Sequence, residues 1–168
     1  MLNKLLKKLT ASPRVREAFE APEKGITCLY DMAEGQRAFL TAALARQTER
    51  PILYVAPSDG QAMRAADDIS TWLGGGAAYM PAGEMSFTRG TASRDVAFRR
   101  LSVLQSAYRG ETRVLCVPAD ALLMRFQQPE MYEEYAVSLR VGDVMQPMAL
   151  MEKLVRMGYE RVDMVEGR

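Results

Sequence analysis

One stretch of the sequence has the spacing of a phosphate-binding loop. The apolar residues 26–30 (ITCLY) lead into DMAEGQRAFLTAAL, where a P-loop protein carries GxxxxGK[ST] between a buried strand and a helix. In such a loop, backbone N–H groups, a lysine and a hydroxyl hold the phosphates and Mg²⁺. When the two are aligned on the start of the helix, the informative positions of this chain are Tyr30, Gly35, Gln36 and Arg37. Gly35 alone matches the consensus.

The other positions of this degenerate Walker A motif have lost the chemistry of the site. Tyr30 brings a side chain to the place where backbone must approach a phosphate, Gln36 lacks the charge of lysine, and Arg37 cannot ligate a metal. Asp31 and Glu34 add negative charge beside the place where a triphosphate would lie. We therefore expect this chain to hold no nucleotide, no metal and no other cofactor.

A second interpretation of the same turn is that Gln36 and Arg37 bind another anion at the helix N-terminus. The neighbouring Glu34 favours a solvated first turn instead. The chain also contains no histidine, which excludes imidazole bases, histidine-activated nucleophiles and histidine metal ligands. No strand ends in the acidic pair that would hold Mg²⁺ and orient water. We expect no catalytic residue in this chain.

Strands and helices alternate around this turn, which predicts an α/β fold with a parallel sheet covered by helices on both faces. The predicted strands are residues 26–30, 52–56, 77–80 and 113–117, so Cys28 and Cys116 should both be buried. Short helices should cover residues 2–9 and 13–20. Helical spacing gives two later helices the apolar faces Ala62, Ala66, Ile69 and Leu73, and Ala97, Leu101, Leu104 and Tyr108. The glycine run 74–76 should end the first of these two helices.

The pattern changes after residue 135. Residues 137–143 and 159–165 look like strands around a helix at 146–157, with Pro147 in its first turn and Gly158 at its end. A strand, a helix and a strand without a partner sheet form an incomplete unit, so we expect the chain to be truncated. The predicted layout is an N-terminal helical segment (1–21), a P-loop-like α/β domain (22–136) and the start of a second, α+β domain (137–168).

Composition bears on partners and location. The 22 basic and 21 acidic residues leave a net charge of +1, which gives no overall electrostatic case for nucleic-acid binding. The strongest candidates for a local DNA-binding patch are the arginines on and near one predicted helix: Arg89, Arg94, Arg99, Arg100 and Arg109. They spread around the helix and do not form one stripe, which favours a solvated helix surface over DNA contact. No apolar run is long enough to span a bilayer, and the N-terminus is too charged for a secretory signal. We expect a cytoplasmic protein without membrane contact.

The joint order of several motifs resembles a known family. The order is CLYDMAEGQRAFLTAALARQ, PILYVAPS, PAGE, FRRLSVLQ, RVLCVPADALL, LRVG and GYERVD. It is similar to the N-terminal module of the bacterial transcription-repair coupling factors, which is itself similar to the first domain of the excision-repair protein UvrB. The resemblance covers about residues 22–168. The segment at residues 80–94 is too short for the long hairpin with which UvrB clamps damaged DNA.

The resemblance implies a role without chemistry for this part of such a protein. In full length, the family displaces stalled RNA polymerase with an ATP-driven DNA translocase and recruits UvrA through its second N-terminal domain. ATP and Mg²⁺ would then belong to the motor, and the contacts with RNA polymerase and DNA to parts that are absent here. The resemblance implies that Arg161 contributes to the UvrA-binding surface. The alternative is a UvrB-type ATPase fragment that still binds nucleotide.

Overall fold

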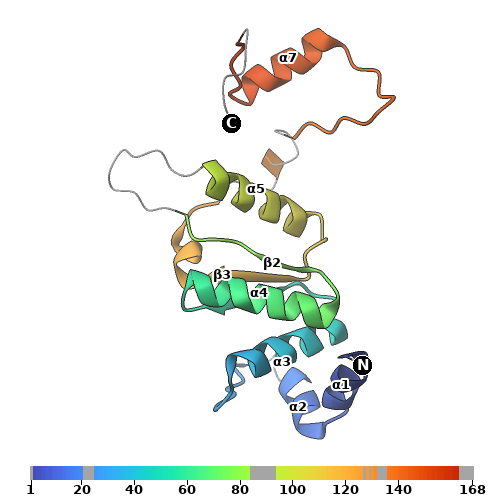
Figure 1. The fold of residues 1–168 in the computed structure, drawn as a ribbon, viewed down its shortest axis with the longest axis vertical. Coiled ribbons are helices and arrows are strands. Elements are labelled where there is room, and N and C mark those ends of the chain that lie inside the picture. Colours follow the sequence, from blue (N-terminus) through green and yellow to red (C-terminus); the bar gives the residue numbers. More distant parts are fainter. Residues whose placement is uncertain are drawn as a thin grey trace. The chain divides into compact units, whose positions relative to one another are not determined.

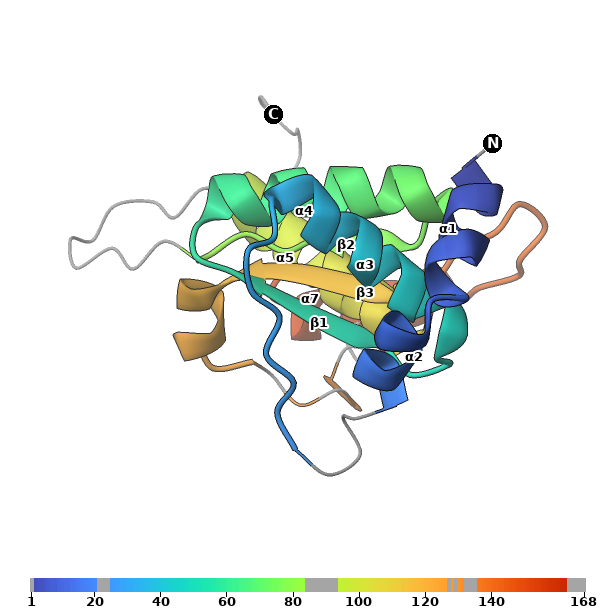
Figure 2. The same ribbon diagram turned by 90° about the horizontal axis from the view of Figure 1, so that it is seen from below.

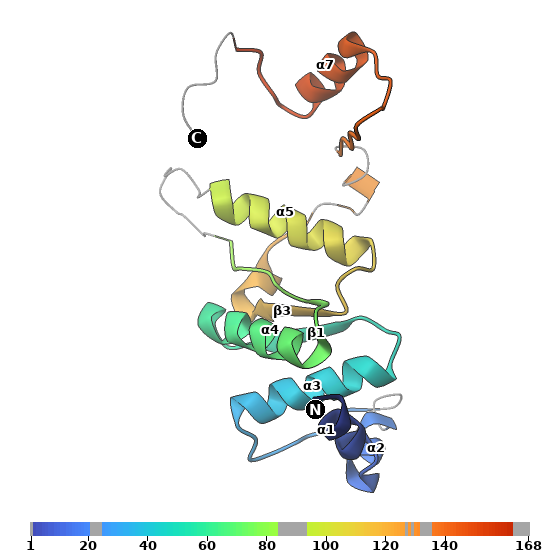
Figure 3. The same ribbon diagram turned by 45° about the vertical axis from the view of Figure 1, so that its right-hand side comes forward.

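The computed structural model describes residues 2–20, 25–83, 94–126, 128, 130–131 and 136–162. The chain divides into two compact units, Met1–Arg125 and Phe126–Arg168. Figures 1 and 3 show the elements of each unit along the chain. None of the helices in these parts is long and apolar enough to cross a bilayer.

The first unit is built on a small parallel sheet. Its strands are β1 (Ile52–Ala56), β2 (Ala77–Tyr79) and β3 (Val114–Pro118), and β3 lies between the other two. Val114 stands opposite both Ile52 and Ala77 in the register. Parallel neighbours require crossover connections, and the helices α4 (Asp59–Leu73) and α5 (Arg94–Tyr108) lie in them. The predicted α/β class and three of the four predicted strands are confirmed.

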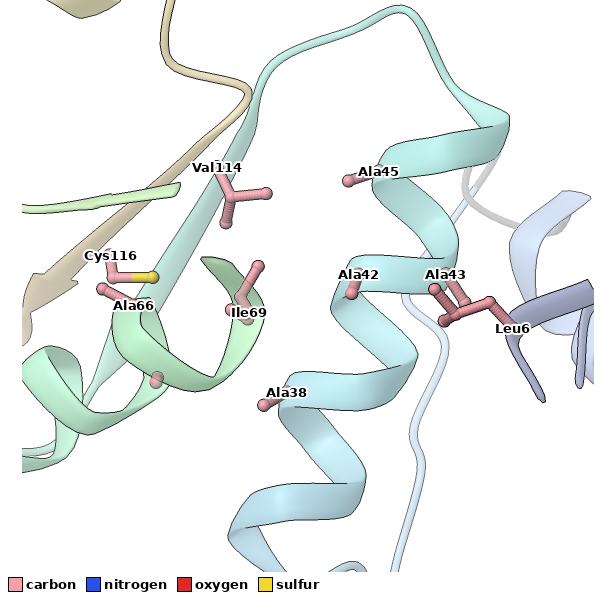
Figure 4. Close-up of a cluster of buried hydrophobic side chains, with 10 residues drawn as sticks. Leu6, Ala38, Ala42, Ala43, Ala45, Ala66, Ile69, Val114 and Cys116 are labelled. Carbon is pink, nitrogen blue, oxygen red and sulfur yellow. The ribbon is translucent and has the colours of Figure 1, made fainter. Parts of the chain in front are cut away.

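The main core lies between one face of this sheet and a layer of helices. Helix α3 (Glu34–Gln47) packs there beside α4, and the residues on this side of α3 are small: Ala38, Ala42 and Ala45 are at most 1% exposed. Figure 4 shows Ala42 and Ala45 pointing toward the side of the helix where Ile69 and Val114 lie. Alanines allow two helices to approach closely, so α3 and α4 form a tight pair.

The N-terminal helices extend this core on the far side of α3 (Figure 2). They are α1 (Leu2–Thr10) and α2 (Pro13–Glu20), close to their predicted bounds. Leu6 is 1% exposed and joins the same cluster as Ala43, and the two lie together in Figure 4. Helix α1 therefore packs on the domain through Leu6, whereas Leu5 is about half exposed.

A smaller core covers part of the other sheet face. Met80, Val117 and Ala121 are buried there, and Val103 and Leu104 of α5 pack against them. Ala121 belongs to a short 3-10 helix, η2 (Ala119–Leu123). The predicted apolar face of α5 is therefore wrong in part. Of its four residues, Leu104 is half-buried, whereas the other three are exposed: Ala97, Leu101 and Tyr108.

This asymmetry has a simple cause, because α5 lies over β2 and β3 and leaves β1 open. Leu53 and Val55 of β1 are about half exposed, although they point to the face opposite the main core. A helix that lies over only part of a sheet face needs a narrower apolar stripe than the sequence period suggests. The period correctly predicts the helix but not the width of the face it covers.

The predicted strand at residues 26–30 is wrong. These residues run extended toward α3 but pair with none of the described strands, and Ile26 is 94% exposed. Cys28 is exposed rather than buried, whereas Cys116 is buried as predicted. A short apolar segment is stable as a strand only when it pairs with a neighbouring strand and packs against other side chains. Among the described residues no strand pairs with residues 26–30.

Several helix ends are fixed as the sequence indicates. Ser58 caps α4 by accepting the backbone N–H of Gln61 at 3.4 Å. Gly74 ends the same helix in the left-handed conformation (φ 79°), and Gly75 and Gly76 also have positive φ values. Two side chains absent from the predictions supply the remaining partners: Arg46 donates to Trp72 O at the end of α4, and Arg113 donates to Ala45 O at the end of α3.

In the second unit, the predicted helix is present. Helix α7 spans Pro147–Arg156, with Pro147 at its start and Gly158 at φ 88° just beyond its end. Lys153 Nζ donates a hydrogen bond of 2.7 Å to Ala136 O. The strands expected at 137–143 and 159–165 are wrong over their described residues, none of which is in a strand. No sheet partner is available to them there, and residues 163–165 lie outside the described parts.

The two cysteines should differ sharply in reactivity. Burial raises the pKa of the Cys116 thiol to about 12, so it should carry almost no thiolate at pH 8, whereas Cys28 is exposed. We expect one rapidly modified thiol per native chain with Ellman's reagent and two in denaturant. Cys28→Ser should abolish the rapid phase, and Cys116→Ala should leave it unchanged. Two rapid thiols in the native protein would contradict the buried position of Cys116.

Candidate functional site

The candidate site lies at the carboxyl ends of the strands. β1 ends at Ala56, Pro57 and the cap Ser58 follow, and α4 begins at Asp59. The first turn of α3 reaches the first turn of α4, because Gln61 Nε2 donates a hydrogen bond of 2.8 Å to Glu34 Oε1. Loops at this edge of a parallel sheet carry the ligand sites of α/β proteins. The predicted phosphate position of the sequence therefore lies at this edge.

Glu34 is the centre of a polar network at this edge. Besides the bond from Gln61, its Oε2 lies 3.7 Å from Nε of Arg64, one turn further along α4. The hydrogen bond from Gln61 has the largest effect and lowers the pKa of the Glu34 carboxyl. Desolvation opposes it, and the charges of Arg64 and Arg37 lower the pKa further, so that the pKa lies below its ordinary value. The carboxylate is thus held ionised where a P-loop would receive phosphate oxygens.

The two residues in the lysine and hydroxyl positions have local partners. Gln36 turns back so that its Oε1 accepts the backbone N–H of Ala33 at 3.0 Å. This is the glutamine half of a capping box, and it uses a donor at the helix start that a phosphate would otherwise require. Arg37 Nε donates to Met32 O at 3.2 Å. Both side chains therefore stabilise the turn itself.

The remaining consensus positions also differ from a phosphate loop. Tyr30 is 83% exposed, and Asp31 has a positive φ of 59°, a conformation that favours glycine or asparagine. Gly35 lies in the first turn of α3, and a Cβ added there would meet no atom within 4 Å. Alanine would therefore fit equally well at the position of Gly35, the one residue that matches the consensus.

Little space is left beside the network. The cavity bounded by α3, the end of β1 and α4 has a volume of about 20 Å³, enough for about one water molecule. It is lined by Glu34, Arg37, Tyr54, Ala56, Pro57, Gln61, Arg64, Ala65 and Asp68.

Sequence reasoning missed the two partners of Glu34. Ser58 and Gln61 have the S-x-x-Q spacing of a capping box, which places Gln61 in the first turn of α4. That signal predicts the helix start but not the bond to Glu34, because the bond depends on how closely α3 and α4 pack. Arg64 follows Gln61 by three positions and therefore lies on the same side of α4.

The candidate arginines near α5 do not form one described patch. Arg99 and Arg109 are exposed, whereas Arg100 is half-buried and donates to Pro81 O at 2.6 Å. Arg89 and the side chain of Arg94 lie outside the described residues. The part of the chain that the structure describes therefore gathers no more than single arginines here.

A second polar contact ties β2 to the start of α4. Asp59 Oδ1 accepts the Tyr79 hydroxyl at 2.6 Å and the backbone N–H of Ala82 at 3.1 Å. Desolvation, together with the hydrogen bond and the negative charge of Asp59, raises the pKa of Tyr79 to about 12. One carboxylate therefore fixes the carboxyl end of β2 against the N-terminus of α4, where negative charge is favourable.

Comparison with curated proteins shows a similarity over most of the chain. Over 141 residues, which are 83% of this chain, the sequence is 29% identical to the transcription-repair-coupling factor of Bacillus subtilis (strain 168). This chain is related to the transcription-repair-coupling factors. The family resemblance inferred from the motif order is thereby confirmed. The match spans 12% of the length of that relative.

Two other comparisons give no match. No family model matches this chain, and no solved structure matches it. The relationship to the coupling factor therefore rests on the sequence alignment.

Arg161 belongs to the second unit, whereas the first turn of α3 belongs to the first unit. Arg161 is exposed, as are Tyr159 and Val162 beside it. Asp163, which would share a strand face with Tyr159 and Arg161, lies outside the described residues. A contact of Arg161 with a partner remains a prediction.

The contact between Tyr79 and Asp59 should give a dependence of stability on alkaline pH. The folded-state pKa of about 12 exceeds the ordinary value of 10.0, so the stabilisation is complete below pH 10 and is lost as the pH rises toward 12. At pH 8, Tyr79→Phe should lower the free energy of unfolding by about 1 kcal/mol. Urea denaturation should show this difference shrinking above pH 10.

The exposed Tyr108 is the matched control, because Tyr108→Phe removes a hydroxyl from α5 without removing a recorded hydrogen bond. Its stability should follow that of the wild type at every pH. A constant difference between Tyr79→Phe and wild type from pH 8 to pH 12 would refute the assignment.

Proposed function

We propose that this chain is a non-catalytic scaffold module of a transcription-repair coupling factor. The observation that carries the proposal is the Glu34 network, in which an ionised carboxylate, paired with Gln61 and Arg64, occupies the edge of the sheet that a nucleotide would need. The relationship to the Bacillus subtilis coupling factor supports the assignment to this kind of protein. The module acts by its surfaces and binds no cofactor of its own.

The finer fold assignment is part of the same proposal. We propose that residues 22–136 form a degenerate P-loop-like domain similar to the first domain of UvrB, preceded by a helical segment (1–21). Residues 137–168 then begin the second, α+β domain. The order of strand, helix and strand around the parallel sheet supports this interpretation.

The proposed partners follow from the resemblance to the family. UvrA would bind through the second domain, while RNA polymerase and DNA would be contacted by other parts of the full-length protein. ATP and Mg²⁺ would serve the translocase motor of that protein. The near-zero net charge supports a module that itself binds DNA weakly. We further propose a cytoplasmic protein without membrane contact.

The competing function is a UvrB-type ATPase fragment, and calorimetry with ATP and Mg²⁺ separates the two. We expect no saturable heat from the wild-type chain, because Glu34 repels phosphate and Gln36 and Arg37 are engaged by the turn. The double variant Gln36→Lys with Arg37→Thr restores the missing charge and hydroxyl. It should still show no ATP hydrolysis, since Tyr30 and Glu34 remain.

Glu34→Gln serves as the matched variant because it removes the charge and keeps the size of the side chain. It should lose the contact with Arg64 and still fail to bind nucleotide in the micromolar range. Saturable micromolar binding of ATP by the wild-type chain would favour the ATPase alternative and end the scaffold proposal.

A second prediction tests the partner. In a coupling factor that carries the complete second domain, Arg161→Ala should weaken UvrA binding by about 1–3 kcal/mol if the exposed guanidinium pairs with a carboxylate of UvrA. The 168-residue chain alone should bind UvrA poorly. Surface plasmon resonance with immobilised UvrA measures both affinities.

Arg156→Ala is the matched control, because Arg156 is also exposed and lies five positions earlier at the end of α7. It changes the net charge by the same amount and should leave UvrA affinity unchanged. Equal affinities of the wild type and Arg161→Ala would remove Arg161 from the proposed interface.

A further inference from the structure

An open groove runs along the β2 side of the sheet. It has a volume of about 330 Å³, within the ~300–1,000 Å³ range of ligand sites in proteins. One wall is α4, the other is α5, and Ala77 and Tyr79 of β2 form the floor. The wall residues are Met63, Ala66, Asp67 and Ser70 on α4, and Arg99 and Val103 on α5.

The floor of this groove is the edge of a sheet. Among the described strands, β2 pairs with β3 alone. Gly76 O accepts the N–H of Val114, and Met80 N–H donates to Cys116 O. The backbone groups of Gly76 and Met80, at the two ends of β2, therefore face β3. In a parallel pair the facing alternates along the strand, which turns the N–H and C=O groups of Ala77 and Tyr79 outward into the groove. An extended backbone can pair with such an edge.

Each wall carries one charged residue, Asp67 on α4 and Arg99 on α5, and these two residues do not form an ion pair with each other. Asp67 and Arg99 are both exposed. Among the described residues neither the carboxylate of Asp67 nor the guanidinium of Arg99 has a hydrogen bond or an ion pair, although the charge of Arg99 acts on the nearby Tyr79 hydroxyl. Beside these charges the walls are apolar, with Met63 on α4 and Val103 on α5. A ligand that fits both walls must therefore present one cation and one anion on opposite sides.

We propose that this groove binds an extended peptide of a partner protein, which adds a strand to β2. Successive side chains of a strand point to opposite faces, so two adjacent residues of opposite charge would reach the two walls together. The basic residue would face Asp67, the acidic residue would face Arg99, and flanking apolar residues would cover Met63 and Val103. This inference is independent of the proposed scaffold function, because it concerns another edge of the sheet.

Charge favours such a peptide over a second copy of this chain. If two β2 strands paired, each groove would receive the sequence Ala77-Ala78-Tyr79, which carries no charge for Asp67 or Arg99. The added strand would then offer no partner to Asp67 or Arg99. A foreign strand with adjacent opposite charges supplies a partner to each.

The test uses the full 168-residue chain and a labelled peptide with the core Val-Lys-Glu-Val. Amide NMR spectra should show saturable shifts at Ala77 and Tyr79, and fluorescence anisotropy should give the affinity. A control peptide with the core Val-Lys-Val-Glu-Val puts both charges on one face and should bind about fivefold more weakly or worse. A second control, N-methylated at alternate backbone positions, lacks the donors for strand pairing and should not bind.

Charge reversals on the exposed walls provide the sharper test and leave both cores intact. Asp67→Lys and Arg99→Glu should each weaken Val-Lys-Glu-Val by about fivefold or more. The double variant should restore binding, because a shift of the peptide by one residue exchanges the faces of its two charges.

Each other outcome overturns the proposal. Absence of saturable shifts up to millimolar peptide would show that the edge accepts no strand. Equal binding of the two charge patterns, or no rescue in the double variant, would remove the charged walls as the recognition element. Light scattering that reveals a dimer disrupted by the same single reversals would assign the groove to a second copy.

Discussion

The close packing of α3 on α4 is the constraint on which the first unit depends. On the side of α3 that faces α4, Ala38, Ala42 and Ala45 are almost fully buried, and Ile69 and Val114 lie in the same cluster. A larger side chain at one of these positions would separate the helices by a distance that a well-packed core does not tolerate. The same closeness brings Glu34 within hydrogen-bond distance of Gln61, so the site chemistry depends on the core.

Two arginines make this arrangement more rigid. Arg46, on α3, reaches the last carbonyls of α4, and Arg113, just before β3, reaches the last carbonyls of α3. Each helix end is thereby tied to a different element. Carbonyl groups at a helix end attract cations because the helix dipole is negative there. The helix layer and the sheet are thus joined by polar bonds at their edges as well as by the alanine contacts.

The elements that the sequence predicts well are those with local causes. Ser58 and Gly74 bound α4, and Pro147 and Gly158 bound α7, through conformations that these residue types prefer. The sequence also shows that Gln36 and Arg37 replace the lysine and the hydroxyl residue of a phosphate loop, but it does not predict their hydrogen bonds to Ala33 and Met32. Failures arise where the outcome depends on distant partners. Residues 26–30 have the composition of a strand, but a strand forms only against a neighbour, and the exposed face of α5 likewise depends on which strands lie beneath it.

The central place of β3 has a consequence for how the chain folds. β1 and β2 precede β3 in the chain, yet neither pairs with the other, since β3 lies between them. During synthesis from the N-terminus, both strands emerge before the one segment that can bridge them. Contacts of this kind close long loops and slow the search for the native state. The alanine-faced helix pair is complete earlier, so it can hold β1 and β2 in place until Val114–Pro118 arrives and turns two unpaired strands into a sheet.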